Sequence, residues 1–495
     1  MSYTKLAVKG AATVFVISIL AAFLGYVARF ILVKNLSVED FGLFYSVFAF
    51  LGMFGVFKSL GFDRALTKFI PEFMHEKEYG RVKSSIIFVS IVQLITNTIV
   101  IIALYMVSGY LAQNFFRSPQ ADIALKLMAI AFFLDSFVLV LKFAFQGFKK
   151  MAYFAGIDVA KMLLVIAIIL IGTSMDYGIL LPVAAYVLSP VIVIGIFGFI
   201  LLKRIFPEFL KSKFAYEKNV MDRISRYSIF AMSAGVGMVI LGYTDTLLLT
   251  YFSGLTSVAL YNVALPTAKV LMYFPRSIAG ILLPLVSELW AKNEKALIRE
   301  GIESLYKYTV IVIIPLVFMI LSFSDLLINL LFGKEYLLAS NALKILSIGM
   351  IFAVLYAVNI DFFLGIGKPE INNLIVYSAA LFNLAANIIM IPIWGIIGAA
   401  ISTTISYFIM MAVGVAKIRK YIPIKFPVKT WAKTFIAGII FVFIILLLKW
   451  ILALNAWIEA VIVLSISGLA YLALLFLLKI VSINELKIIY GRILR

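Results

Sequence analysis

Four basic residues lie inside long stretches of otherwise apolar sequence: Arg29, Lys58, Lys269 and Arg276. A charge in such a stretch is costly unless it faces water or a partner, so each is a candidate for function. Lys269 and Arg276 are seven residues apart, which places both on one face of a helix, about 10 Å apart along its axis. Guanidinium groups bind phosphate oxygens bidentately and lysine supplies a point charge, so the expected chemistry is binding of an anion such as a diphosphate.

Two acids, Asp135 and Asp245, also lie in apolar stretches. Asp135 is near the middle of its stretch, so binding and release of a proton or metal cation is one interpretation, and a hydrogen-bonded structural acid is the other. The cations have alternatives too, since they can snorkel to the interface or form structural ion pairs with Asp245 or Asp63. Asp158 and Lys161 are three residues apart and are expected to pair with each other.

Three prolines accompany Lys269 and Arg276 in the same stretch: Pro266, Pro275 and Pro284. Each removes a backbone hydrogen bond and tends to bend a helix, so movement there could reposition the two cations. Prolines are also tolerated in membrane helices without such a role. Gating by these prolines is therefore a hypothesis beside a purely structural interpretation.

The elements that must position these charges follow from the composition. Of 495 residues, 64% are hydrophobic and the mean hydropathy is +1.11, well above what soluble domains show. Zero cysteines and a single histidine, His75, exclude disulfides and clusters of thiolate or imidazole ligands, and we expect neither a metal nor a cofactor. The formal charge of +19 is distributed between apolar stretches, which argues against nucleic-acid binding.

A helix needs about 20 mostly apolar residues to cross a membrane, and the sequence predicts about fourteen such spans. The connections alternate in their content of lysine and arginine, and cytoplasmic loops carry the excess. Both termini are therefore predicted to be cytoplasmic, with the chain in the cell membrane. The predicted spans are 9–33, 41–63, 84–108, 121–147, 155–173, 178–202, 226–252, 258–288, 306–333, 338–365, 372–393, 396–416, 433–454 and 457–479.

The first twelve spans repeat with a period of about 218 residues, the offset between Lys58 and Arg276. Such a parallel repeat predicts two pseudo-symmetric lobes of six helices. Lys142 and Asp361 fall at equivalent places in the two halves, where a latch is conceivable and snorkelling is the alternative. The predicted domains are an N-terminal lobe at 1–202, a cytoplasmic linker at 203–225, a C-terminal lobe at 226–416, and a basic connector with two helices and a tail at 417–495.

Several short motifs occur in a characteristic order: Leu36–Leu43, Leu60–Phe62, Arg64–Leu66 ahead of Pro71–Phe73, Leu260–Asn262 leading to Leu283–Pro284, and Gly395–Ala400. With them the chain resembles, over nearly its whole length, the polysaccharide flippases of the multidrug/oligosaccharidyl-lipid/polysaccharide exporter superfamily. The resemblance implies an all-α integral membrane protein in which two six-helix lobes face a central cavity, with two additional C-terminal helices. It also implies alternating access.

The substrate is likewise implied by the resemblance alone. It would be a polyprenyl- or dolichyl-diphosphate-linked oligosaccharide, moved from the cytoplasmic to the outer leaflet by a monomer in contact with membrane lipids. The four cations then become candidates for binding the anionic headgroup. The two acids become candidates for coupling to H⁺ or Na⁺.

Three other functions stay open at this point. A flippase for a peptidoglycan precursor also has fourteen helices, and charge does not distinguish it. A cation-coupled multidrug exporter resembles a twelve-span arrangement with acidic cavities. A membrane glycosyltransferase or polymerase needs clustered carboxylates or a large extramembrane loop, whereas Glu39 and Asp40 fit better at a helix N-terminus. The sequence also has no GxxxxGK[ST] phosphate loop, so we expect a transporter that is not an enzyme and does not use ATP directly.

Overall fold

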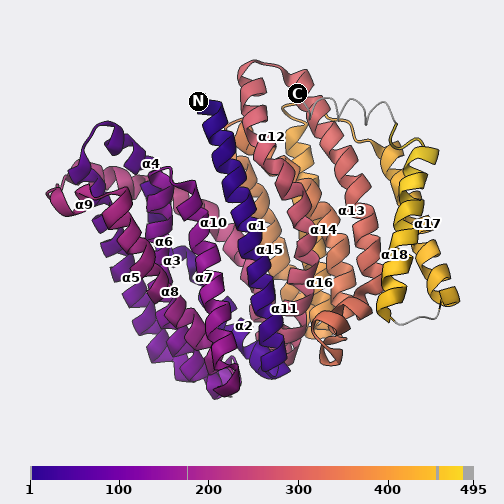
Figure 1. The fold of residues 1–495 in the computed structure, drawn as a ribbon, viewed down its shortest axis with the longest axis horizontal. Coiled ribbons are helices and arrows are strands. Elements are labelled where there is room, and N and C mark those ends of the chain that lie inside the picture. Colours follow the sequence, from indigo (N-terminus) through magenta and orange to yellow (C-terminus); the bar gives the residue numbers. More distant parts are fainter. Residues whose placement is uncertain (1–2, 176, 453–455, 483–495) are drawn as a thin grey trace. The chain divides into compact units, whose positions relative to one another are not determined.

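The computed structural model describes the backbone of residues 3–175, 177–452 and 456–482. It describes side chains at 13–175, 177–229, 231–232, 235–273, 282–452 and 458–482. Within these ranges every regular element is a helix and no strand occurs (Figure 1). Among the described residues, thirteen helices are long and apolar enough to cross a membrane, or fourteen if one bent pair counts as a single span. The predicted number of spans is therefore confirmed.

The chain forms two compact units. Unit 1 comprises the residues up to Asn262 together with Val376–Ala399, and unit 2 comprises Val263–Ile375 and the residues from Ala400 onward. The two units are defined by which residues pack together, and their bounds differ from those of the predicted lobes. The predicted division into lobes at 1–202 and 226–416 stays a prediction.

Unit 1 contains the first ten described helices, α1 to α10. Helix α1 runs beside α7, and α5 and α8 both pack against α6 (Figure 1). The chain is apolar on nearly every face of these helices, as expected where lipid covers one side and protein the other. Their bounds are α1 (Tyr3–Asn35), α2 (Val38–Met53), α3 (Gly55–Ser59), α4 (Phe62–His75), α5 (Tyr79–Asn114), α6 (Gln120–Gly147), α7 (Met151–Gly172), α8 (Leu180–Ile200), α9 (Glu208–Lys211) and α10 (Lys218–Ser253).

The remaining helices belong wholly or partly to unit 2, where α13 packs against α14 and α17, and α17 against α18. Asn262 and Val263 divide α11 between the units, and α15 and α16 are divided in the same way. The bounds are α11 (Leu255–Lys269), α12 (Tyr273–Ala291), α13 (Lys295–Leu331), α14 (Ala339–Gly365), α15 (Pro369–Trp394), α16 (Ile396–Ile418), α17 (Val428–Leu452) and α18 (Ala456–Leu477).

The second predicted span is not one straight helix. It is broken after Met53, and the axis bends by 55° between α2 and the segment Gly55–His75. A second break follows at Leu60 and Gly61, which both adopt positive φ, 49° and 77°. A Cβ at Gly61 would meet the backbone carbonyl of Ser228, so only glycine permits this approach of α4 to α10.

The eighth predicted span is also interrupted. Helix α11 ends at Lys269, a 3₁₀ turn covers Val270–Met272, and α12 begins at Tyr273. The prediction of one continuous helix over 258–288 is therefore wrong. Pro266 lies inside α11 and Pro284 inside α12.

The first turn of α2 shows where Glu39 and Asp40 lie. Ser37 caps this helix, its hydroxyl accepting a hydrogen bond of 3.0 Å from the Asp40 amide. Glu39 and Asp40 lie in the first turn, where carboxylates favour the positive end of the helix dipole. Both acids therefore lie at a helix N-terminus, as the sequence predicted, but the residue that caps the helix is Ser37.

Candidate functional site

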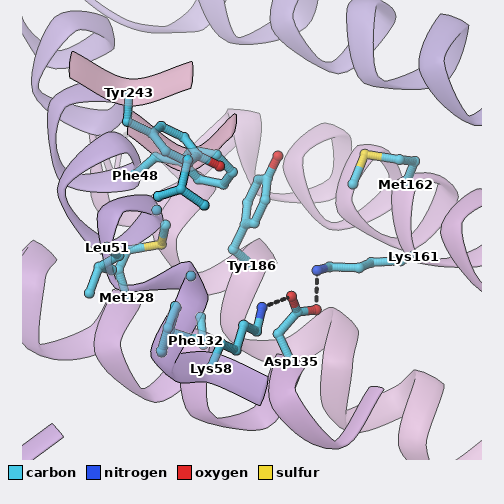
Figure 2. A pocket seen from close by; sticks show the side chains of 14 residues that line it. Phe48, Leu51, Lys58, Met128, Phe132, Asp135, Lys161, Met162, Tyr186 and Tyr243 are labelled. Atoms are coloured by element: carbon cyan, nitrogen blue, oxygen red, sulfur yellow. Dashed lines mark hydrogen bonds and ion pairs between the residues drawn. The ribbon is translucent and has the colours of Figure 1, made fainter. Parts of the chain in front are cut away.

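An ionic cavity lies within unit 1, and its volume is about 330 Å³. Its walls come from α2, α3, α6, α7, α8 and α10. Figure 2 shows the rings of Phe48, Tyr186 and Tyr243 above the charged side chains, and Phe132 beside Lys58. The aromatic side chains are Phe48, Phe132, Tyr186 and Tyr243. A cavity of this size and mixed lining suits the polar part of a ligand.

Three charged side chains meet in this cavity. The Lys58 ammonium donates to Oδ2 of Asp135 and the Lys161 ammonium donates to Oδ1 of the same carboxylate (Figure 2). The side chains are 14%, 21% and 15% exposed for Lys58, Asp135 and Lys161. Two cations and one carboxylate leave the cluster with a formal charge of +1. The site therefore has one positive charge more than its own acid neutralises.

Lys58 lies in the short helix α3 that follows the break in the second span, and it lines the ionic cavity. Helix α3 is a single short turn, and the Lys58 carbonyl accepts a hydrogen bond of 3.0 Å from the Asn97 side chain of α5. Asn97 is fully buried and also donates to the Gln93 carbonyl at 2.7 Å. The Lys58 ammonium lies 5.1 Å from the centroid of the Phe132 ring, which favours a cation there.

Close packing at Gly52 completes the wall. A Cβ on this glycine of α2 would overlap the ring of Tyr243, so the bare backbone lets α10 approach α2. Tyr243 and Gly52 both line the cavity. The shape of the cavity thus depends on one residue with no side chain.

The predicted pairing of Asp158 with Lys161 is wrong. Asp158 instead accepts from Lys142 of α6 at 2.5 Å, and Lys161 pairs with Asp135. Asp158 is 42% exposed, so solvent can stabilise its charge, whereas Asp135 is more buried and needs cations close by. A weak contact along one helix gives way to a stronger contact between two helices.

Arg29 of α1 lies near the aromatic wall but does not line the cavity. Its guanidinium is 4.4 Å from the centroid of the Tyr45 ring and donates to the Asn262 carbonyl. The rings of Tyr45 and Phe48 are 6.4 Å apart, and Phe48 and Tyr186 are 5.8 Å apart. A continuous row of rings therefore joins Arg29 to the cavity.

Asp245 has a different environment, also within unit 1. Its carboxylate accepts 2.5 Å from the Tyr261 hydroxyl and 2.6 Å from the Asn387 amide, and its side chain is buried. Asp63 is buried as well and accepts from the Arg64 amide at 2.9 Å. Among the described contacts, Asp135 pairs with Lys58 and Lys161, and Asp245 accepts from Tyr261 and Asn387.

The remaining predicted site residues lie in unit 2. Lys269 is the exposed last residue of α11. Arg276 and Pro275 belong to the backbone of α12, but their side chains lie outside the described residues. Convergence of these two cations with Arg29 and Lys58 stays a prediction, as does gating by Pro266, Pro275 and Pro284.

Lys161 is the residue of the cluster that the sequence did not single out as a site. The signal was available, since Lys161 is a charge inside the apolar stretch Met151–Gly172. Asp158, one turn away, offered an apparent partner that explained it. Only the packing of α6 against α7 shows the other pairing.

Comparison with protein families decides the relationship. The model of a family described as "Polysaccharide biosynthesis protein" matches residues 7–290, more than half of the chain. This chain belongs to the polysaccharide biosynthesis protein family. The model described as MatE matches residues 234–389, so this family member also carries the sequence pattern of the wider exporter superfamily.

Relatives of this polysaccharide biosynthesis protein match over most of their length. "Uncharacterized membrane protein MJ1068" of Methanocaldococcus jannaschii is 34% identical over 100% of both chains. "Probable low-salt glycan biosynthesis flippase Agl15" of Haloferax volcanii is 22% identical, over 92% of this chain and 93% of the relative. The solved structure "Lipid II flippase MurJ, inward closed conformation" superposes with a TM-score of 0.75 at 17% identity, covering 97% of this chain and 99% of the other.

These findings confirm the predicted class of fold, an all-α multi-pass membrane protein of the exporter superfamily with the two-lobe transporter architecture. They also establish the general function of this family member, which is that of a flippase or transporter.

Proposed function

We propose that this protein moves a polyprenyl- or dolichyl-diphosphate-linked oligosaccharide from the cytoplasmic to the outer leaflet of the cell membrane. Membership of the polysaccharide biosynthesis protein family and the likeness to a glycan biosynthesis flippase support this substrate class. Both termini are cytoplasmic in this proposal, because the basic connections lie on the same side as the termini.

The observation that carries the proposal is the ion cluster of Lys58, Asp135 and Lys161. In the structure Asp135 neutralises one of the two lysines. A diphosphate carries more negative charge than a carboxylate and offers more acceptor oxygens, so it can compete with Asp135 for both ammonium groups. In a cavity that excludes most water, each of these contacts is stronger than at an exposed site.

Further cations extend this headgroup site in the proposal. Arg29 lies at the end of the aromatic row that begins at the cavity, where it can bind a second phosphate or a sugar acid. The sequence prediction adds Lys269 and Arg276 to the candidates for binding the same headgroup. The rings of Phe48 and Tyr186 offer apolar faces on which sugars stack.

Transport then proceeds by alternating access and forms no covalent intermediate. Binding of the headgroup releases Asp135 from its lysines, which removes one tie between α3, α6 and α7 and favours rearrangement of the helices. When the substrate leaves on the outer side, Asp135 returns to the two ammonium groups. The protein is in this view a transporter and not an enzyme.

A cation-coupled exporter is the second candidate, favoured by one observation. Asp245 is a buried carboxylate that accepts hydrogen bonds from Tyr261 and Asn387, an oxygen-bearing site within the MatE match. We rank it second because the cavity of unit 1 has a formal charge of +1, which repels cationic drugs. A lipid-linked peptidoglycan precursor carries the same diphosphate, so the transport assay below is run in parallel with a fluorescent lipid of that kind as a second substrate.

The decisive experiment measures flipping of a fluorescent polyprenyl-diphosphate oligosaccharide in proteoliposomes. Lys58→Ala, Lys161→Ala, Arg29→Ala and Arg276→Ala are compared with Lys142→Ala. The last variant is the matched control, since it also breaks a Lys–Asp pair between α6 and α7 but does not line the cavity. We expect the cavity variants to lose about tenfold or more in rate, as loss of one charged contact implies.

Two results would overturn this proposal. One is equal flipping by Lys58→Ala, Lys161→Ala and the Lys142→Ala control, with all variants folded. The other is a folded wild type that ignores both diphosphate lipids but exports a cationic drug when a Na⁺ or H⁺ gradient is applied.

A further inference from the structure

A second cavity in unit 1 is apolar and has no part in the headgroup site. Its volume is about 630 Å³, and it lies between α5 and the junction of α2 with α3. On α5 its lining residues recur at helical spacing and form one stripe, which includes Val100, Ala103 and Val107. On the other side Phe54 and Phe57 form the wall. We refer to this cavity as the α5 groove.

The α5 groove offers almost no polar group to a ligand. Only Thr96 and Tyr110 among its lining residues carry a side-chain oxygen, and the Thr96 hydroxyl already donates to the Val92 carbonyl at 2.9 Å. The groove is open along its length, because Ile99, Val107 and Tyr110 are exposed. Such a site binds a long apolar chain that enters sideways from the membrane.

The groove and the ionic cavity share one wall. At the junction of α2 with α3, Gly55 and Lys58 line the ionic cavity, whereas Phe54 and Phe57 line the α5 groove. Lys58 and Phe57 are consecutive residues, so adjacent side chains of one helical turn face a charged and an apolar site. The break in the second span thus separates the two sites by the width of one helix.

We propose that the α5 groove binds the isoprenoid tail of the same lipid whose diphosphate lies between Lys58 and Lys161. This inference rests on the proposed function. A lipid with a charged headgroup and a long apolar tail needs two such sites side by side. Helix α3 is only one turn long, so the lipid can pass across it at the point where headgroup and tail join. The sites on the two faces of the Gly55–Lys58 turn have this complementary chemistry.

The direction of the groove agrees with this occupant. Its lining on α5 runs from Thr96 toward the C-terminal end of that helix, at Leu111. With both termini cytoplasmic, this end of α5 lies in the outer half of the membrane. The tail would therefore already be in the outer leaflet while the diphosphate is held at Lys58, which suits release of the lipid to the outer side.

The test combines a substitution that fills the α5 groove with a photoreactive lipid whose crosslinks show where the isoprenoid tail binds. Ala103→Trp fills the groove, and Met106→Trp is the matched control, since Met106 is on the same helix, is 82% exposed and does not line the groove. The probe is a polyprenyl diphosphate with a diazirine in its third isoprene unit, photolysed in proteoliposomes, with adducts located by mass spectrometry. Unlabelled probe lipid and an ordinary membrane phospholipid are the two competitors.

We expect adducts on α5 that unlabelled polyprenyl diphosphate suppresses and phospholipid does not. Ala103→Trp should reduce these adducts and the flipping rate about tenfold, whereas Met106→Trp changes neither. A tail-free sugar diphosphate should bind equally to all three proteins. Equal adducts in wild type and Ala103→Trp, or suppression by phospholipid as well, would mean that the groove holds bulk membrane lipid only and would overturn the inference.

The same data separate this inference from the proposed function. If wild type shows specific adducts on α5 but does not flip the lipid, the tail site stands and the transport proposal fails. If Lys58→Ala and Lys161→Ala lose flipping while Ala103→Trp keeps both flipping and adducts, the headgroup site stands and the tail site fails.

Discussion

Lys161 of α7 forms its ion pair with Asp135 of α6, although Asp158 lies one turn before it on its own helix. Asp135 also holds Lys58 of α3, so one carboxylate ties together three helices of unit 1. A buried acid with two cations has a clear energetic consequence. Its removal leaves two positive charges close together in a region with little water.

We expect Asp135→Asn to be strongly destabilising, by about 3 to 5 kcal/mol, because it leaves two ammonium groups without their counter-ion. The midpoint of thermal unfolding in detergent measures the effect, with Asp158→Asn as the control at an exposed pair. The triple variant Lys58→Met, Asp135→Leu, Lys161→Met should recover most of the stability but should not flip the lipid. Recovery of flipping in this variant would contradict the proposed role of the cluster.

The approach of α4 to α10 gives a second prediction. We expect Gly61→Ala to reduce stability by about 1 to 2 kcal/mol for its positive φ, and by more because its Cβ meets the Ser228 backbone. Gly109→Ala on α5 is the control, since a Cβ there meets nothing within 4 Å and alanine favours helix by about 1 kcal/mol. Thermal unfolding should therefore move in opposite directions for the two variants, and equal shifts would argue against the packing described.

We propose Asp245 as a candidate for ion coupling. Its carboxylate is buried and accepts hydrogen bonds from Tyr261 and Asn387. If a Na⁺ or H⁺ gradient accelerates flipping in wild type, we expect Asp245→Asn to keep basal flipping and lose the acceleration. Flipping rates with and without each gradient test this, and an unchanged response to the gradient in Asp245→Asn would exclude Asp245 as the coupling acid.

The proposed orientation can be tested with single introduced cysteines, because the chain has zero cysteines of its own to be labelled. His75 follows the second span and Gln120 precedes the fourth, and both side chains are exposed. In intact cells a membrane-impermeant maleimide should label Gln120→Cys and not His75→Cys. Permeabilised cells should label both, and the reverse pattern in intact cells would place the termini outside.

Much of the fold could be predicted from the sequence because the membrane imposes a simple rule. Backbone polar groups in hydrocarbon must be satisfied within the helix, so an apolar run of about 20 residues has one available structure. This is why about fourteen spans were predicted, and thirteen or fourteen are found in the part of the chain that the structure describes. Charges inside those runs were equally visible, and they identified Lys58 and Asp135 as candidates.

The sequence by itself therefore determined the class of protein, the number of spans and the residues too costly to bury without a purpose. Tertiary structure decided which charges meet. Lys161 could be paired from sequence only with a neighbour on its own helix, because contacts between α3, α6 and α7 depend on helix rotation and on breaks such as the one after Met53. Near that break Lys58 pairs with Asp135 while Phe57 lines the α5 groove, and which groups meet across different helices depends on packing that no local pattern of residues contains.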